Sequence, residues 1–240
     1  AARATAAPGD PGDHLDVYTG TISAAQVEDL VALGIDRHEL EVAGVPGERG
    51  EKAQVRVEAI LSGAQAERLQ GQGLELELKT IDGQTAAERA TVQAAEGYEV
   101  FRTYSGDGGL KAEYEQAARD NPRIAKLVNF GKTVNGQDMV ALKVSQNARS
   151  LKDGAKPAVL YLSAQHAREW ITPEMNRRLM HYVLDNYGSD PRITSVLNEN
   201  ELWFVPVANP DGYDFTFTEG NRLWRKNLRD NNGDGEITPG

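Results

Sequence analysis

The sequence predicts an α/β protein in two parts, a small α+β region followed by a larger region with a mixed sheet and flanking helices. Three observations support this division. Strand-like and helix-like patterns alternate along the chain. Residues 157–162 and 202–207 are continuous apolar runs, which are typical of interior strands. Residues 1–96 hold 8 Lys and Arg against 17 Asp and Glu, whereas residues 97–240 hold 18 against 19. Most of the net charge of −10 therefore belongs to the first part, and the two parts are expected to differ in role.

Six elements are predicted in the first region. β-Branched, aromatic or alternating apolar residues indicate its strands, and Ser23 and Ser62 are suited to cap its helices. The predicted elements are strands 17–22, 40–45, 53–61 and 74–78 and helices 24–33 and 62–71. The order β-α-β-β-α-β is that of the split βαβ or ferredoxin-like plan, which hosts many functions and implies none.

The segments on either side of this region have a different composition. Residues 1–16 are rich in Ala, Pro and Gly and lack the apolar core of a signal peptide, so a flexible tail is predicted. A secretion signal already removed and a trimmed chain would both explain it. Residues 81–97 are polar and rich in Ala, Glu and Gln, which predicts a linker that is partly helical. That linker serves either as a spacer or as a segment open to proteolysis.

Residues 98–240 form the predicted α/β region. Asn135-Gly136 between two apolar runs is a strong signal for a β-hairpin. Thr172 and Pro173 are suited to the N-cap and first position of a helix that ends near Tyr187. The predicted elements are helix 109–121, strands 124–130, 138–145, 157–162 and 202–207, and a helix from 172 to 187. Ligands of such sheets bind at the carboxyl ends of the strands.

Composition excludes several classes of function. The chain has no Cys, so disulfides, thiol catalysis and Cys-ligated zinc are excluded, although secretion is not. A net charge of −10 argues against nucleic acid as the main partner. No apolar run reaches the length of about 18 residues that a membrane-spanning helix needs. A transition-metal site would have to use carboxylates and some of the four His residues.

The pattern H-x-x-E occurs twice, and its position distinguishes the two pairs. His38 and Glu41 lead into a strand, where residues three apart point to opposite faces and cannot bind one ion. His166 and Glu169 lie in a predicted turn after a buried strand, where backbone curvature can bring both side chains together. The second pair is therefore the candidate metal site. His181, within an apolar helix, and His14, in the tail, are expected to be structural or solvated.

Two further segments are candidates for chemistry. Residues 221–226 (NRLWRK) are basic and aromatic, and they form either a solvated surface over a packed Trp or an arginine site for a carbonyl or carboxylate. Residues 230–237 resemble the first part of a calcium loop, with oxygens at Asp230, Asn232 and Asp234. The alternative for this second segment is a polar surface loop.

Taken in order, residues 166–173, 205–213 and 221–226 resemble successive motifs of zinc metallocarboxypeptidases of the carboxypeptidase A type. The resemblance covers about residues 98–240. It implies an incomplete zinc-carboxypeptidase-like sheet in this region, and a ferredoxin-like propeptide in residues 17–80. It also implies a secreted proenzyme, with a peptide or protein substrate and an activating protease as its partners.

The resemblance also implies roles for individual residues. His166 and Glu169 would be zinc ligands, Arg225 would polarise the scissile carbonyl, and Arg168 would contact the substrate. The third ligand of the family is a His further downstream, and no His follows His181. The carboxylate-binding residues and general base of the family also lie further on. We therefore expect an N-terminal portion of a precursor that is inactive and marginally folded by itself.

Two other interpretations stay open at this point. One is a zinc amidase or endopeptidase on the same fold, acting on cell-wall or modified peptides. The other is a non-catalytic module that binds calcium or protein.

Overall fold

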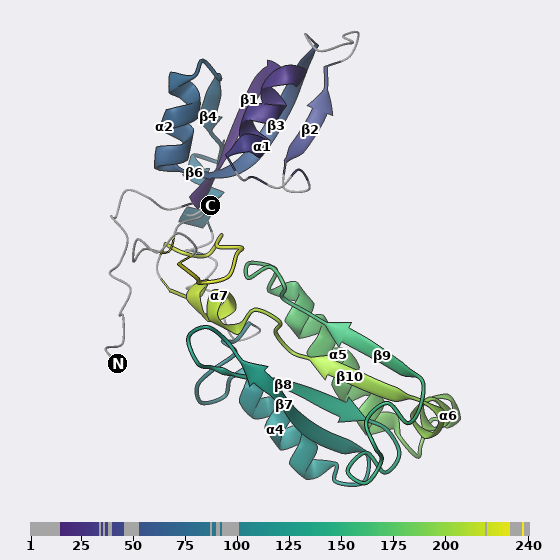
Figure 1. The fold of residues 1–240 in the computed structure, drawn as a ribbon. Coiled ribbons are helices and arrows are strands. Elements are labelled where there is room, and N and C mark those ends of the chain that lie inside the picture. Colours follow the sequence, from purple (N-terminus) through teal and green to yellow (C-terminus); the bar gives the residue numbers. More distant parts are fainter. Residues whose placement is uncertain are drawn as a thin grey trace. The chain divides into compact units, whose positions relative to one another are not determined.

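The computed structural model describes residues 15–33, 35, 37, 40–45, 53–86, 88–89, 92, 101–218, 220–230 and 237. They divide into two compact units, whose main parts are residues 15–86 and residues 101–218 with 224–229 (Figure 1). Among the described helices, none is long and apolar enough to cross a membrane.

The first unit is a four-stranded antiparallel sheet with two helical connections. Its strands occur in the order β2-β3-β1-β4, so the first and third strands are central. The elements are β1 (Leu15–Ser23), η1 (Ala24–Gln26), α1 (Val27–Ala32), β2 (Glu41–Gly44), β3 (Gln54–Ser62), α2 (Gly63–Gly71) and β4 (Leu76–Leu78). The predicted sequence of strands and helices is therefore present. Its assignment as a ferredoxin-like propeptide stays a proposal.

Capping and alternation explain why these elements form. Ser23 and Ser62 each accept a hydrogen bond from the backbone of a Gln three residues on, and that Gln side chain binds back to the serine N–H. On β3, Val57, Ala59 and Leu61 are buried at alternate positions. They pack against Leu30 and Leu69 of the helices in the core of this unit.

The structure places a β-hairpin at the start of the predicted linker. β5 (Thr80–Ile81) and β6 (Gln84–Thr85) pair as a two-stranded sheet. Asp82 and Gly83 between them have φ of 55° and 77°. This Asp-Gly pair supplies the two positive φ angles that a two-residue hairpin turn requires. Residues 86, 88, 89 and 92 are helical, as a partly helical linker predicts.

The second unit contains the predicted mixed sheet. Its strand order is β7-β8-β10-β9, and of these pairs only β10 and β9 run parallel. The strands are β7 (Ala125–Lys132), β8 (Asp138–Val144), β9 (Ala158–Leu162) and β10 (Glu201–Val205). The helices are α4 (Leu110–Asp120), α5 (Ile171–Asn186), α6 (Pro191–Glu199) and α7 (Pro210–Phe215). The β7–β8 hairpin is confirmed, and the chain between its strands contains Asn135-Gly136.

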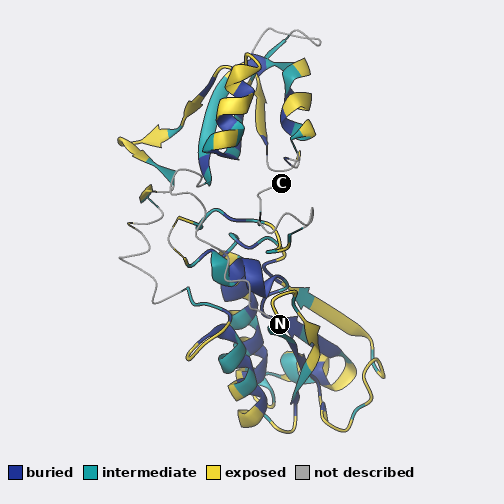
Figure 2. Cartoon of the chain, turned by 60° about the vertical axis from the view of Figure 1, so that its left-hand side comes forward, coloured by how far each residue is buried: buried dark blue, intermediate teal, exposed yellow. Residues whose placement is uncertain are grey.

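The core of the second unit lies between this sheet and helices α4, α5 and α6 (Figure 2). Tyr114 of α4, Leu142 of β8, Met180 of α5, Leu197 of α6 and Phe204 of β10 have no exposed surface. Helix α6 was missed in the sequence pattern. Its start is marked by Asp190, whose side chain accepts a hydrogen bond from Arg192 N, and by a Pro in the first helical position.

The prediction that residues 157–162 are buried on both faces is wrong. Val159, Leu160 and Leu162 of β9 are 45, 61 and 42% exposed. The reason is position, because β9 lies at the edge of the described sheet and has a neighbour on one side only. The similar apolar run in β10 lies inside the sheet and is mostly buried, as predicted.

The start of α5 also differs from the prediction. The helix begins at Ile171, and Trp170 is its N-cap without a side-chain hydrogen bond. Thr172 is therefore not the cap. Its hydroxyl instead donates to Glu169 O and accepts from Ala164 N, at 2.9 and 3.0 Å. Thr172 thus joins the two sides of the turn that precedes the helix.

Candidate metal centre

The candidate site lies in the turn between β9 and α5. Because β9 and β10 are parallel, their carboxyl ends meet at one edge of the sheet, and this turn leaves that edge. Ala164, in the turn, has a left-handed φ of 46°, which is uncommon for a residue with a side chain. The Ala164 N–H donates to the Thr172 hydroxyl, and Ala164 O accepts from the N–H of Asn209, which follows β10.

His166 and Glu169 converge within this turn. His166 Nδ1 and Glu169 Oε1 are 2.7 Å apart, and the side chains are 38 and 42% exposed. An imidazole nitrogen and a carboxylate oxygen are ligand types that zinc accepts, so the pair fits two positions of a zinc site. Among the residues that the structure describes, no group of three or more His, Cys, Asp or Glu side chains could hold a metal ion.

Arg225 is joined to the same turn through its backbone. Ala167 N donates to Arg225 O at 2.9 Å, and the Ala167 side chain is fully buried. The two residues are far apart in sequence, so this contact is a result of the tertiary fold. Arg225 and Arg168 are both half-buried, and Arg168 lies between the two candidate metal ligands in the chain.

Other candidate residues lie elsewhere. His181 Nε2 is 2.6 Å from Glu113 Oε1, which ties α5 to α4 and supports a structural role. Glu41, in β2, is exposed, whereas His38 and His14 lie outside the described residues. Of the candidate calcium ligands, Asp230 is described, while Asn232 and Asp234 are not.

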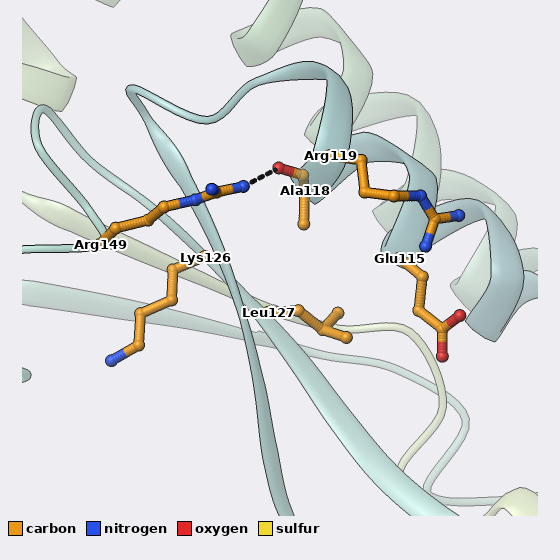
Figure 3. A pocket seen from close by; sticks show the side chains of 6 residues that line it. All are labelled: Glu115, Ala118, Arg119, Lys126, Leu127 and Arg149. Atoms are coloured by element: carbon orange, nitrogen blue, oxygen red, sulfur yellow. Dashed lines mark hydrogen bonds between the residues drawn. The ribbon is translucent and has the colours of Figure 1, made fainter.

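The structure also has a shallow hollow of about 490 Å³ beside α4 and β7 (Figure 3). Its lining residues are Glu115, Ala118, Arg119, Lys126, Leu127 and Arg149. The cations already have protein partners. Arg149 donates to Ala118 O, Lys126 binds Asp153, and Arg119 binds Gln116. The turn between β9 and α5 that holds His166 and Glu169, hereafter called the metal turn, does not line this hollow.

Comparison with known proteins identifies a family. The zinc carboxypeptidase family model matches residues 110–238, which is more than half of the chain. A curated zinc carboxypeptidase of Saccharothrix mutabilis subsp. capreolus is 36% identical over 120 residues, covering 50% of this chain and 27% of that protein. Carboxypeptidase A2 of Rattus norvegicus is 30% identical over 218 residues, covering 88% of this chain and 51% of that protein.

Solved structures show the same fold. Carboxypeptidase A from Helicoverpa armigera superimposes with a TM-score of 0.64 at 22% identity, over 94% of this chain and 56% of that one. Thrombin activatable fibrinolysis inhibitor superimposes with a TM-score of 0.59 at 18% identity, with the same coverage. The chain therefore spans about half the length, or less, of these relatives. Its sequence and its fold agree in one conclusion: the chain belongs to the zinc carboxypeptidase family.

Proposed function

We propose that this chain is the N-terminal portion of a secreted zinc carboxypeptidase precursor that removes C-terminal amino acids from peptides or proteins. The observation that carries the proposal is the convergence of His166 and Glu169 at 2.7 Å, in a turn at the carboxyl edge of the sheet. The backbone bond from Ala167 to Arg225 supports it, since it joins the metal turn to the segment of the candidate catalytic arginine.

Each residue has a proposed role. His166 and Glu169 hold one zinc ion, which when bound acts as a Lewis acid and lowers the pKa of its water. The guanidinium of Arg225 binds the carbonyl oxygen of the scissile bond and stabilises the negative charge that develops there. Arg168, between the two ligands in the chain, binds the substrate chain. The half-exposed state of all four residues is compatible with access by a peptide.

The proposal includes a zymogen. Residues 17–80 would be the propeptide, and residues 81–97 the segment cut by an activating protease. The first unit has its own sheet and core, and this supports a role as a separate folding unit. The exposed hairpin residues Ile81 and Gln84 lie at the start of the proposed cleavage segment.

The proposal also limits what residues 1–240 do by themselves. The described residues supply two ligands at one point, whereas catalytic zinc sites usually have three protein ligands. The relatives extend well beyond the matched portion. We propose that the third ligand, the general base and the carboxylate-binding residues come from further chain, so that residues 1–240 alone are inactive. Calcium binding at residues 230–237 remains a separate proposal.

The test measures zinc content and peptidase activity of the full-length protein and of residues 1–240. The full-length protein, treated with a protease that cuts within 81–97, should bind one zinc and cleave a peptide with a free C-terminal carboxylate. His166→Ala or Glu169→Gln should abolish both properties. Asp185→Asn, at an exposed position of α5, is the matched control and should change neither.

Three results would contradict parts of this proposal. Equal cleavage of C-terminally amidated peptides would favour an amidase or endopeptidase. Calcium without zinc on metal analysis would favour a binding module. Peptidase activity with stoichiometric zinc from residues 1–240 would show that this portion is sufficient.

A further inference from the structure

The backbone around Arg225 is held at two successive carbonyl groups. Arg225 O accepts from Ala167 N at 2.9 Å. Lys226 O, one peptide further on, accepts from Asn209 Nδ2 at 3.0 Å and from Trp224 Nε1 at 2.6 Å. A chain that is bound at two consecutive peptides has little freedom to rotate between them. The position of Arg225 relative to the metal turn therefore depends on both carbonyl contacts.

Asn209 is the residue that connects this segment to the rest of the site. It follows β10, and only 6% of it is exposed. Its backbone N–H donates to Ala164 O at 3.1 Å, in the metal turn. Its side-chain Oδ1 accepts from Gly212 N at 3.1 Å and thereby caps α7. One buried residue thus contacts the metal turn through its backbone N–H, and the start of α7 and Lys226 O through its side-chain amide.

Gly212 makes this arrangement unusually close. A Cβ atom at position 212 would lie 2.5 Å from Lys226 O and 2.6 Å from Asn209 Nδ2, which is closer than real Cβ atoms approach such groups. The backbone of α7 therefore lies directly against the Lys226 carbonyl. A side-chain amide at position 209 can bind both groups, because its oxygen accepts from Gly212 N and its nitrogen donates to Lys226 O.

We propose that Asn209 is a positioning residue that sets Arg225 against the His166–Glu169 turn. The proposal deepens the proposed function, because the role of Arg225 as an oxyanion-binding group rests on it. An Asp side chain at position 209 would still accept from Gly212 N. It would also present a second oxygen to Lys226 O, so that the donor is lost and two acceptors face each other. Asn209→Asp thus separates the link to Lys226 from the cap of α7.

The experiment is amide hydrogen exchange on the full-length protein, with Asn209→Asp, Asn209→Ala and Gly212→Ala variants. The Ala167 amide bonds to Arg225 O, so it reports whether the Arg225 segment has kept its place. In Asn209→Asp it should exchange about tenfold faster, as expected for the loss of one hydrogen bond, while the Gly212 amide stays protected. In Asn209→Ala both amides should lose protection. Gly212→Ala should raise exchange at Ala167, because the added Cβ displaces Lys226 O.

Controls and kinetics make the test selective. Asn198→Asp is the matched control, since Asn198 is exposed and its Oδ1 accepts only at the surface, from Tyr187 OH. It should leave both amides unchanged. In the activated protein, Asn209→Asp should lower kcat about tenfold with KM and zinc content nearly unchanged, because the oxyanion contact acts in the transition state.

The outcomes for Asn209 and for the proposed function are distinguishable. A folded Asn209→Asp variant whose Ala167 amide exchanges at the unmodified rate would overturn the positioning role, whatever its activity. A lower kcat without faster exchange at Ala167 would overturn it as well. Absence of zinc and of peptidase activity in the unmodified protein would instead contradict the proposed function, while the exchange result would still decide the link to Arg225.

Discussion

The two units of this molecule use buried polar residues very differently. In the first unit the described buried polar side chains are Asp16 and Ser62, and the rest of its core is apolar. In the second unit they include Lys143, Glu201 and Asn209, together with six further polar residues. Burying a polar group costs free energy unless it is hydrogen-bonded. The second unit therefore depends on many specific polar contacts, and these hold irregular backbone in a defined place.

The Lys143 region illustrates the difference. Lys143 Nζ, fully buried, lies 2.9 Å from Asp153 Oδ1 and 3.4 Å from Glu201 Oε1. Glu201 in turn accepts from the backbone N–H groups of Gly154 and Ala155, so the loop before β9 is tied to β10. In the first unit the comparable ion pair, Lys79–Glu58, is about one-third exposed on both side chains. Equivalent charge pairs thus have different surroundings in the two units.

The largest effect that would test this comparison is expected for Lys143→Ala. It leaves Glu201 buried without its cation, so the free energy of unfolding should fall by about 3–5 kcal/mol. The matched change, Lys79→Ala in the first unit, should cost no more than about 1 kcal/mol because the pair is partly exposed. Urea unfolding followed by circular dichroism measures both. An equal fall in the free energy of unfolding for both variants would show that the buried ion pair of the second unit contributes no more to stability than the partly exposed pair of the first unit.

Acid should weaken the second unit through Glu113. Burial raises the pKa of Glu113, but hydrogen bonds from His181 and Arg177 outweigh it and hold the pKa below the ordinary 4.5. A carboxyl group with a lowered folded pKa stabilises the fold above its unfolded pKa, and this contribution is lost as the pH falls through the folded value. The midpoint of thermal unfolding should therefore drop more steeply below about pH 4.5 than in Glu113→Gln.

The matched control for the pH effect is Glu77→Gln, at an exposed position of the first unit. Its unfolding midpoint should follow the unmodified protein at every pH. Parallel curves for Glu113→Gln and the unmodified chain between pH 7 and pH 3 would show that the Glu113 contacts to Arg177 and His181 contribute nothing to the acid response.

The smallest change in stability is expected at the edge strand. Leu160→Thr in residues 1–240 should alter the free energy of unfolding by no more than about 0.5 kcal/mol, since the side chain is 61% exposed. It should nevertheless reduce self-association, because exposed apolar edge strands favour aggregation. Light scattering at increasing concentration measures this effect. Leu202→Thr, at a buried position of β10, is the contrasting variant and should destabilise clearly. A large loss of stability in Leu160→Thr would show that β9 is covered.

Much of the local structure could be predicted from residue patterns. Alternation in β3 and the Ser62 cap of α2 are determined by neighbouring residues, and so is the Asn-Gly signal of the β7–β8 hairpin. The ligand types at His166 and Glu169, and the turn that contains them, could also be inferred locally. Helix α6 was missed although Asp190-Pro191 carries a recognisable start signal.

The site as a whole required the tertiary structure. The bond from Ala167 to Arg225 and the link from Asn209 to Lys226 join residues that are distant in sequence, and no periodic pattern reports such contacts. The sequence around Asn209 does not show what its side-chain amide donates to. The order of the motifs at residues 166–173, 205–213 and 221–226 nevertheless predicted the family of the chain.

The sequence by itself determined most of the strands and helices, the two-part charge division and the chemical types available for a metal. Only the tertiary structure decided which strands are neighbours, and this is why two similar apolar runs became an exposed edge strand, β9, and a buried strand, β10. The physical reason is that hydrophobic pattern reflects the preference of a segment for burial, whereas actual burial depends on the other segments that pack against it.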